Sequence, residues 1–488
     1  MNRTKKIILA LMAVFFVTAC GDDFLELTPP DAIADVEAFE TLGDFHAGLN
    51  GIYATVRQGP YWGKNMMMNF DVSVSDAYAL EGFTNQWGTQ YGWQIQSGTG
   101  EGANLWLVAY RVATRSSNLI NNFGNLEEGS EQERNQILGE AKALRAMAHF
   151  DLVRVFGKPY RIGNPSSDLG VPIVTVENLE EKPRNTVAEV YDFVLTELHE
   201  ARDLITQNRH RRYLGVNAVN ALLARVYHEM GDWSNAITYA SAVIDEVPLS
   251  SGQEYADIWQ SDGDPAGNDE IIWITAVHST EFGNDLNLGS NFVGGNPPLP
   301  PAYNWRVDYV PADDLIAMYD QANDIRYSSY FLTDIPIAGI TADVTVFIKY
   351  PHDNPNFTQR GMNQMKVFRA SEMYLIRAEA YAESGQAAQA NADLGALRAA
   401  RIDGYSHSDL SGNALLEAIY DERRKEMVLE GSRWFDLRRR GEGFQRTPQA
   451  GTGPFDNLVI EPDNYRWIWP IPQGEMDANL KMVQNPGY

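Results

Sequence analysis

The residue types that enzymes use are present in this chain, but their spacing does not match common catalytic or metal-binding motifs. The eight histidines are scattered, with no H-E-x-x-H or His-x-His pair, so a transition-metal site has little support. No G-x-S-x-G motif marks a nucleophilic serine. The Gly-rich stretch 98–102 has neither the preceding strand nor the following GK[ST] of a phosphate-binding loop. With 65 acidic residues, any pair of glycosidase carboxylates would be an arbitrary choice.

The acidic stretch 262–270 (DGDPAGNDE) resembles a calcium-binding loop only in part. Counted from Asp262, Ala266 stands where such a loop needs an oxygen donor, and Trp273 stands where it needs a bidentate glutamate. The pattern favours a turn before a strand. We therefore predict no metal site and no cofactor from these motifs.

Cys20 is the only cysteine, and its surroundings predict lipidation. A basic start followed by the apolar residues 7–17 is typical of a secretory signal peptide, because a finished transmembrane helix needs about 20 residues. Residues 17–20 (VTAC) resemble a bacterial lipobox, in which the cysteine becomes the first residue and is acylated; the alternative is an ordinary buried cysteine. We predict a signal peptide at 1–19 and a lipidated spacer at 20–30, since two or three acyl chains hold a protein stably to a membrane.

Composition and charge limit the classes of function. The apolar fraction of 44% and the aromatic fraction of 11% exclude general disorder. The net charge of -26 argues against binding to nucleic acid, which needs clustered Lys and Arg. The one basic cluster that stands out is Arg438–Arg440. No nucleic-acid partner is expected.

Apolar residues recur at helical spacing in several segments of the chain. The first runs from Phe39 to Tyr53, and the second from Ile137 to Val155, where Gly157 and Pro159 end it. A further helix begins after the capping box Thr186–Glu189, in which each side chain satisfies a backbone amide of the other residue. These segments predict long amphipathic helices.

Two later segments, 221–248 and 374–401, align with each other. Ala224, Tyr227, Gly231 and Ala236 fall in register with Ala378, Tyr381, Gly385 and Ala390. This order of small residue, aromatic residue and turn glycine is typical of a tetratricopeptide helix pair, in which alanines let two helices approach closely. We favour this repeat over an unrelated pair of helix hairpins.

Two long segments, 57–104 and 262–365, show no sustained period and are rich in Gly, Asn and aromatic residues. Within the second, EIIWITAV is a predicted strand. The fold class predicted from these patterns is mainly α: a tetratricopeptide-like superhelix of helix pairs, with long irregular loop-rich excursions and a few short strands.

Residues 422–441 (ERRKEMVLEGSRWFDLRRRG) interleave charged residues with core formers such as Trp434 and Phe435. This mixture predicts a paired, partly buried ionic network at a helix end. Together with 469–488 (WPIPQGEMDANLKMVQNPGY), it resembles the SusD/RagB family of outer-membrane nutrient-binding lipoproteins. Residues 140–157 (EAKALRAMAHFDLVRVFG), the early LNGIY at 49–53 and the lipobox match as well, so the resemblance covers nearly the whole mature chain.

The resemblance implies four tetratricopeptide-type helix pairs that support an irregular ligand-binding half. It divides the chain into an N-terminal part at 31–260 and a C-terminal part at 261–488, which form one intertwined body. It also implies non-catalytic binding of an oligosaccharide at the cell surface, with delivery to a SusC-like TonB-dependent transporter. The Gly-Asp-Asp that follows Cys20 resembles the acidic signal that sends such lipoproteins to the outer face of the outer membrane.

The family motifs do not locate the ligand site, but the chemistry of sugars narrows it. A pyranose has an apolar C–H face and a ring of hydroxyls, so its site needs exposed aromatic rings beside Asn, Asp, Gln or Arg. Both excursions offer such combinations: Asp76, Asn85, Gln86, Trp87, Tyr91 and Trp93 in the first, and Phe282, Asn284, Tyr303, Asn304, Trp305 and Arg306 in the second. The alternative for each ring is a local core beneath a long loop. Trp87 and Trp305 are the two rings that we single out as sugar platforms.

Other functions stay open at this point. The same lid mechanism could deliver a different nutrient, such as a peptide. A glycan-active enzyme would need two carboxylates in one cleft. A protein-interaction scaffold of helix repeats would have no use for the aromatic-rich excursions, which argue against it.

Overall fold

The computed structural model describes most of the chain after residue 38. The described residues are 39–176, 181–263, 267, 269–278, 289, 307–337, 340–341, 343–351, 354–359 and 361–488. The predicted signal peptide, Cys20 and the spacer lie outside them, as do Phe282, Asn284, Tyr303, Trp305 and Arg306. Within the described part of the chain, no helix combines the length and the apolar composition that crossing a membrane requires.

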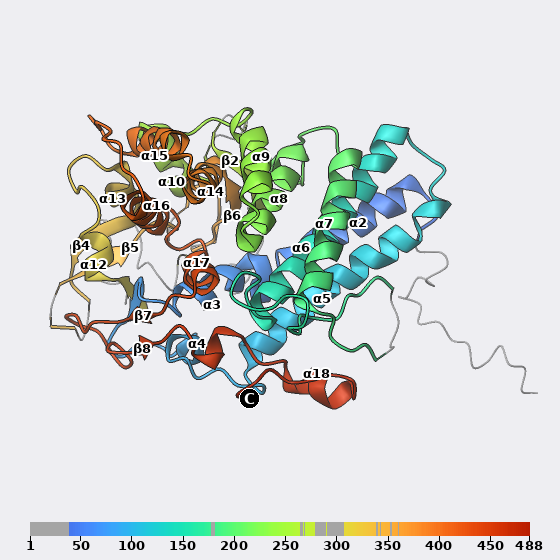
Figure 1. Cartoon of the computed structure of the whole chain (residues 1–488), viewed down its shortest axis with the longest axis horizontal. Helices are drawn as coiled ribbons and strands as arrows, with labels where there is room; N and C mark the ends of the chain where they lie inside the picture. Colours follow the sequence, from blue (N-terminus) through green and yellow to red (C-terminus); the bar gives the residue numbers. More distant parts are fainter. Residues whose placement is uncertain are drawn as a thin grey trace, which may run out of the picture.

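Helices dominate the structure (Figure 1). The α-helices are α2 (Leu42–Val56), α3 (Asn65–Asp71), α4 (Gly88–Tyr91), α5 (Gly100–Asn121), α6 (Glu131–Phe156), α7 (Val187–Leu204), α8 (Val216–Met230), α9 (Trp233–Ile244), α10 (Gly252–Gln260), α12 (Asp313–Ile316), α13 (Ile325–Tyr330), α14 (Ala370–Glu383), α15 (Ala387–Arg401), α16 (Asn413–Glu426), α17 (Arg433–Arg440) and α18 (Gln473–Ala478). Three short helices of other types are η2 (Gly59–Gly63), η3 (Phe123–Asn125) and η5 (Tyr465–Trp467).

The predicted helices form where the sequence signals lie. The capping box predicted at Thr186 and Glu189 begins α7, with both of its reciprocal hydrogen bonds present. Helix α6 ends at Phe156, directly before Gly157. The whole C-terminal part of α6 is buried, because α5 and α7 pack against it from two sides.

The two aligned segments form the helix pairs α8–α9 and α14–α15, and α14 packs against both α8 and α9. Gly231 and Gly385 close the two turns with φ angles of 74° and 75°, a left-handed conformation that glycine adopts without strain. All four aligned alanines are fully buried between the helices. The tetratricopeptide-like order predicted from the sequence is therefore confirmed at both pairs, which lie side by side in Figure 1.

Among the described residues, the strands form four small antiparallel sheets of two strands each. They pair β1 (Ala77–Ala79) with β3 (Tyr309–Pro311), β2 (Ile271–Thr275) with β6 (Met365–Arg369), β4 (Phe331–Ile335) with β5 (Val344–Phe347), and β7 (Phe444–Gln445) with β8 (Val459–Ile460). The predicted strand EIIWITAV is β2, and all five of its residues are buried. Because β1 and β3 come from different excursions, the two loop-rich regions meet in one sheet.

The first excursion is more ordered than its sequence suggested. Residues 57–104 contain η2, α3, α4 and β1, and all but the first residue of α3 are buried. Helix α3 packs against α17, where the ring centroids of Phe70 and Trp434 lie 4.9 Å apart. These short elements were not predicted, because short segments that pack on a core need no helical period of their own.

The predicted ionic network exists and is fully buried. The Glu426 carboxylate accepts hydrogen bonds from Arg326, Arg369 and Arg401 at 2.8–3.1 Å. Burial opposes its ionisation, but the three guanidinium groups outweigh burial and hold the pKa of Glu426 well below its ordinary value. Removing one partner of a buried ion pair is strongly destabilising, because it leaves an uncompensated charge in the interior.

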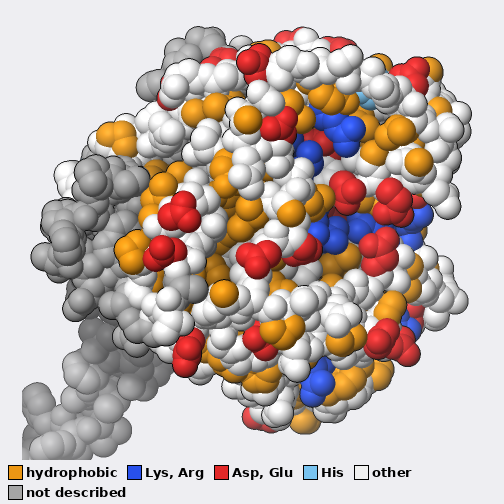
Figure 2. Space-filling view, turned by 90° about the vertical axis from the view of Figure 1, so that its left-hand side faces the viewer, with side chains coloured by type: hydrophobic (Ala, Val, Ile, Leu, Met, Phe, Trp, Pro, Cys, Tyr) orange, Lys and Arg blue, Asp and Glu red, His pale blue; other side chains and the backbone are white. Residues whose placement is uncertain are grey.

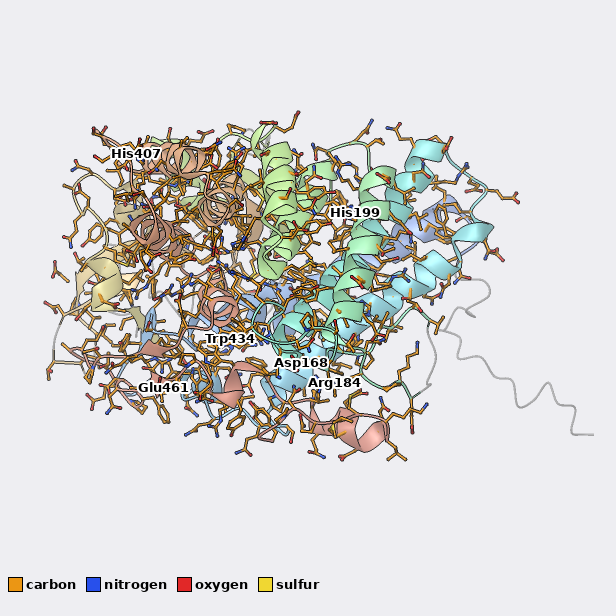
Figure 3. The ribbon with its side chains drawn as sticks, in the orientation of Figure 1. Asp168, Arg184, His199, His407, Trp434 and Glu461 are labelled. Atoms are coloured by element: carbon orange, nitrogen blue, oxygen red, sulfur yellow. The ribbon has the colours of Figure 1, made fainter. Side chains whose placement is uncertain are left out.

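The C-terminal motif fastens the end of the chain to the helices. Arg184, labelled in Figure 3 close to Asp168, donates hydrogen bonds to the backbone oxygen of Val483 at 3.0 Å and to Asn485 at 2.8 Å. It also donates to the backbone oxygen of Phe156, the last residue of α6. The family-like motif at 469–488 is thus structural, which explains why it could not locate a ligand site.

The surface that Figure 2 shows carries Asp and Glu side chains scattered among apolar ones. Lys and Arg side chains are fewer there and gather toward one side of the view. This agrees with the net charge of -26.

Candidate functional site

The rings predicted in the first excursion lie inside the protein. Trp87 is only 3% exposed, and Tyr91 and Trp93 are buried as well. The Nε1 atom of Trp93 donates to the backbone oxygen of Ser73 at 2.6 Å, and that of Trp87 donates to Asn65 at 3.3 Å. The exposure that we predicted for Trp87 is therefore wrong for this structure.

The physical reason is a buried arginine beneath the excursion. The guanidinium of Arg446 lies 3.7 Å from the ring centroid of Tyr91 and donates to the backbone oxygens of Val72, Val74 and Tyr91. These bonds tie the segment around the arginine and turn its rings inward. Asp76 is buried too, and its carboxylate pairs with Arg424 at 2.7 Å.

Other features of the excursion fit a binding role. Asn85 and Gln86 are exposed, as a sugar-binding amide must be. Asn85, Trp87 and Trp93 have positive φ angles of 66°, 55° and 53°. Side chains rarely adopt this left-handed conformation, and such strain clusters at ligand sites. The binding role predicted for these residues stays a prediction.

A large cavity lies elsewhere, between α2, the loop that joins α7 to α8, and β2. Its volume is about 570 Å³, within the size range of small-molecule sites. Four aromatic side chains line it: Tyr53, Tyr213, Trp273 and Phe357. Polar groups lie among them: Asn50, Arg57, His210, Arg211, Arg212, Asp262, Thr275, His278, Asn356 and Gln364.

The loop 208–213 forms one wall of this cavity and is held in place from both sides. The backbone nitrogen of Ile274 in β2 donates to the backbone oxygen of Arg211 at 3.0 Å. The rings of Tyr53 and Tyr213 meet edge to face, with centroids 5.5 Å apart. The Tyr53 hydroxyl accepts a hydrogen bond from the backbone of Leu214 and donates one to buried Glu140. The wall is therefore preorganised by backbone and aromatic contacts.

The cavity and Trp87 flank opposite ends of η2. Arg57, which precedes η2, lines the cavity, and Lys64, which follows η2, lies 5.3 Å from the ring centroid of Trp87. Thr275 at the end of β2 donates to the backbone oxygen of Trp62 within η2 at 3.1 Å. The predicted excursion and the cavity are thus joined by one short helix.

Catalytic groups are sparse in the cavity. Asp262 is the only carboxylate among the described residues that line it, and it pairs with Lys366 at 2.7 Å. Elsewhere in the described ranges, no group of three or more His, Cys, Asp or Glu is arranged to hold a metal ion.

We did not predict this cavity from the sequence. Its walls come from four segments that are far apart in the chain, around Tyr53, Arg211, Trp273 and Phe357. The available signal was the basic run Arg209–Arg212, which we passed over in favour of Arg438–Arg440. The side chains of Arg438, Arg439 and Arg440 are almost fully buried and already have partners within the protein. Arg438 donates to the backbone oxygens of Arg154 and Gly157, Arg439 pairs with Glu379, and Arg440 pairs with Glu442.

Comparison with known proteins gives consistent matches along the chain. Residues 303–488 match the model of the SusD family, and residues 23–228 match a model described as "Starch-binding associating with outer membrane". SusD-like protein P2 of Formosa agariphila is 24% identical over 97% of this chain and 98% of its own length.

Solved structures share the fold. A SusD superfamily protein from Bacteroides thetaiotaomicron superposes with a TM-score of 0.81 at 27% identity, covering 91% of this chain and 100% of that one. A SusD-like carbohydrate-binding protein from Bacteroides vulgatus gives a TM-score of 0.76 at 23% identity, covering 91% and 98% of the two chains. At that lower identity, the likeness concerns the fold alone.

Proposed function

The chain belongs to the SusD family, and from this premise we propose that it binds glycans at the cell surface and delivers them to a SusC-like TonB-dependent transporter. In this proposal the protein is a non-catalytic lid: it takes an oligosaccharide from outside and closes on the transporter. The family description that names starch binding and association with the outer membrane supports both the class of ligand and the location.

The observation that carries the proposal is the cavity beside β2. It places the half-buried rings of Tyr53, Tyr213 and Phe357 next to amide side chains such as Asn356 and Gln364. Rings contact the C–H face of a sugar, and amides exchange hydrogen bonds with its hydroxyls. Asn85, Trp305 and Arg306, which the sequence predicts as ligand contacts, remain part of the proposal.

The carboxylate content of the cavity lining supports a role without catalysis. Retaining and inverting glycosidases both need two carboxyl groups on opposite sides of the scissile bond. Asp262 is the only carboxylate of the described lining, and it is already held in an ion pair with Lys366. This lining supports binding without turnover.

The test is calorimetric titration of the protein, expressed from residue 31 onward, with a panel of oligosaccharides, followed by chromatography of each mixture. We expect binding of at least one oligosaccharide and its recovery intact. Cleavage products would contradict the non-catalytic role. Binding of peptides with no affinity for any glycan would contradict the class of ligand.

Membership of the family and an apolar surface support two further proposals, attachment to the outer membrane and contact with the transporter. Leu107, which is 53% exposed, lines a cavity of about 200 Å³ together with Trp106 and Tyr110. Leu480 and Val483, 83% and 54% exposed, follow another lining residue, Asn479, in the chain. Large exposed apolar side chains of this kind are typical of a docking surface. We propose that this patch contacts the transporter while lipid on Cys20 holds the protein in the outer membrane.

A pull-down from native outer membranes tests both points. The wild-type protein should bring down a large TonB-dependent receptor, and Leu480→Asp should recover less of it. Cys20→Ala should leave the folded protein in the soluble fraction. Isolation of the wild type as a free monomer in mild detergent, or full retention of Cys20→Ala on membranes, would contradict the respective proposal.

A further inference from the structure

The loop between α7 and α8 carries the run Arg209-His210-Arg211-Arg212, and its arginines differ in how their charges are balanced. Arg209 forms an ion pair with buried Glu140 and lies 4.3 Å from the ring centroid of Tyr213. Arg211 donates two hydrogen bonds to Asp269, at 2.8 and 3.0 Å, and a third to the backbone oxygen of Asp262. Both charges are therefore neutralised within the fold.

Arg212 is different. Its side chain is exposed at the cavity, and its Nε donates to Nδ1 of His210 at 3.2 Å. No carboxylate in the described ranges pairs with it. Partial burial lowers the pKa of His210, and the charges of Arg212 and Arg211 lower it further, so the imidazole is neutral at neutral pH and accepts this hydrogen bond. The imidazole thus orients the guanidinium without cancelling its charge.

The other charged side chains among the described residues that line the cavity do not cancel the positive charge of Arg212. Asp262, the only described carboxylate of the cavity, is already paired with Lys366 at 2.7 Å. The charge of Arg212 therefore stays unbalanced by the described lining, in a chain whose net charge of -26 gives an overall field that repels polyanions.

From this charge balance we propose that the cavity beside β2 selects glycans that carry anionic groups, with Arg212 as the residue that pairs with a sugar carboxylate or sulfate. The planar guanidinium matches the two oxygens of either group in a bidentate geometry. The neighbouring rings of Tyr213 and Phe357 hold the sugar itself. This inference rests on the proposed function, since it names the class of glycan that the same cavity takes.

The experiment compares three oligosaccharides of equal length by calorimetry: a neutral α-glucan, an oligogalacturonate and a sulfated galactan fragment. Wild-type protein should bind one or both acidic sugars more tightly than the neutral one. Because removal of a charge-assisted hydrogen bond costs about tenfold in affinity, Arg212→Gln should weaken acidic binding about tenfold and leave neutral binding unchanged. High salt should weaken only the acidic ligands.

Two variants control for charge and geometry. Arg134→Gln removes the same charge from the first turn of α6, away from the cavity, and should bind all three sugars like the wild type. Arg212→Lys keeps the charge but loses the bidentate fork, and should retain part of the preference. Comparing the affinities of the two acidic ligands shows whether the cavity recognises a carboxylate or a sulfate.

The outcomes separate the inference from the function on which it rests. Equal affinity for neutral and acidic sugars, or an Arg212→Gln variant that keeps its preference for acidic sugars, would overturn the inference and leave glycan binding intact. Failure of every sugar, in a protein with an unchanged melting temperature, would overturn both.

Discussion

Two regions of the molecule combine guanidinium groups with aromatic rings, and they do so to opposite effect. Near α16, Arg401 is buried, lies 3.8 Å from the ring centroid of Tyr255 and pairs with Glu426 at 3.0 Å. At the cavity beside β2, exposed Arg212 lies among aromatic side chains without a carboxylate partner in the described ranges. Residue type alone therefore does not separate core from site. What separates them is whether the fold itself supplies the counter-charge.

The largest expected effect comes from removing that counter-charge in the interior. Glu426→Gln leaves Arg326, Arg369 and Arg401 without their shared carboxylate, and we expect the free energy of unfolding to fall by about 3–5 kcal/mol. Urea unfolding of the protein from residue 31 onward measures this change. Glu417→Gln, on the exposed face of the same helix, is the control and should change it by less than about 0.5 kcal/mol. Equal losses of unfolding free energy in both variants would contradict the claim that the buried counter-charge stabilises the interior.

Aromatic rings offer the next test. Trp87 is buried, so Trp87→Ala should lower the free energy of unfolding by about 3 kcal/mol through loss of packing. Phe357 is half-buried at the cavity, so Phe357→Ala should cost less than about 1 kcal/mol while weakening glycan binding about tenfold. Melting curves and calorimetry on both variants measure these effects. A stable Trp87→Ala that has lost glycan binding would restore our first expectation of an exposed platform.

Acid should weaken the ionic interior of the protein. Arg326, Lys425 and Arg398 overcome the effect of burial and lower the pKa of Glu422 from 4.5 to about 2, while Arg423 and Arg439 lower that of Asp436 from 3.8 to about 2. Groups with a lowered pKa stabilise the folded state above their unfolded pKa, and this contribution is lost as the pH falls through the folded value. The free energy of unfolding should fall between pH 4.5 and about 2, by ~1.4 kcal/mol per pH unit for each extra proton that the unfolded chain binds. A flat profile over that interval would contradict the assignment.

The helical frame was predictable because its signals are local. The capping box at Thr186, the register of Gly231 with Gly385 and the apolar strand at β2 each act within a few residues, and each appears where expected. Helix α5 was not predicted, although it packs against both α2 and α6. Its N-terminal turn overlaps the Gly-rich stretch 98–102, which carries no helix-starting signal.

The candidate site was less predictable because burial is a tertiary property. The sequence showed that Trp87, Tyr91 and Trp93 are aromatic, but not that Arg446, some 350 residues later in the chain, would draw the segment inward. The cavity also depends on contacts between residues far apart in the sequence, such as Ile274 with Arg211 and Tyr53 with Tyr213. The inward rings have no local pattern that could reveal them, and the local signal for the cavity was the basic run Arg209–Arg212.

Hydrogen exchange with and without the tightest-binding oligosaccharide tests the central claim most directly, namely that a glycan is held in the cavity beside β2. The account predicts slower amide exchange in the loop 208–213 and at residues 356–357 when ligand is present, because a bound sugar limits opening of the walls that it touches. Exchange around the Glu426 cluster should be unchanged. Protection confined to other segments, or none at saturating ligand, would contradict the claim.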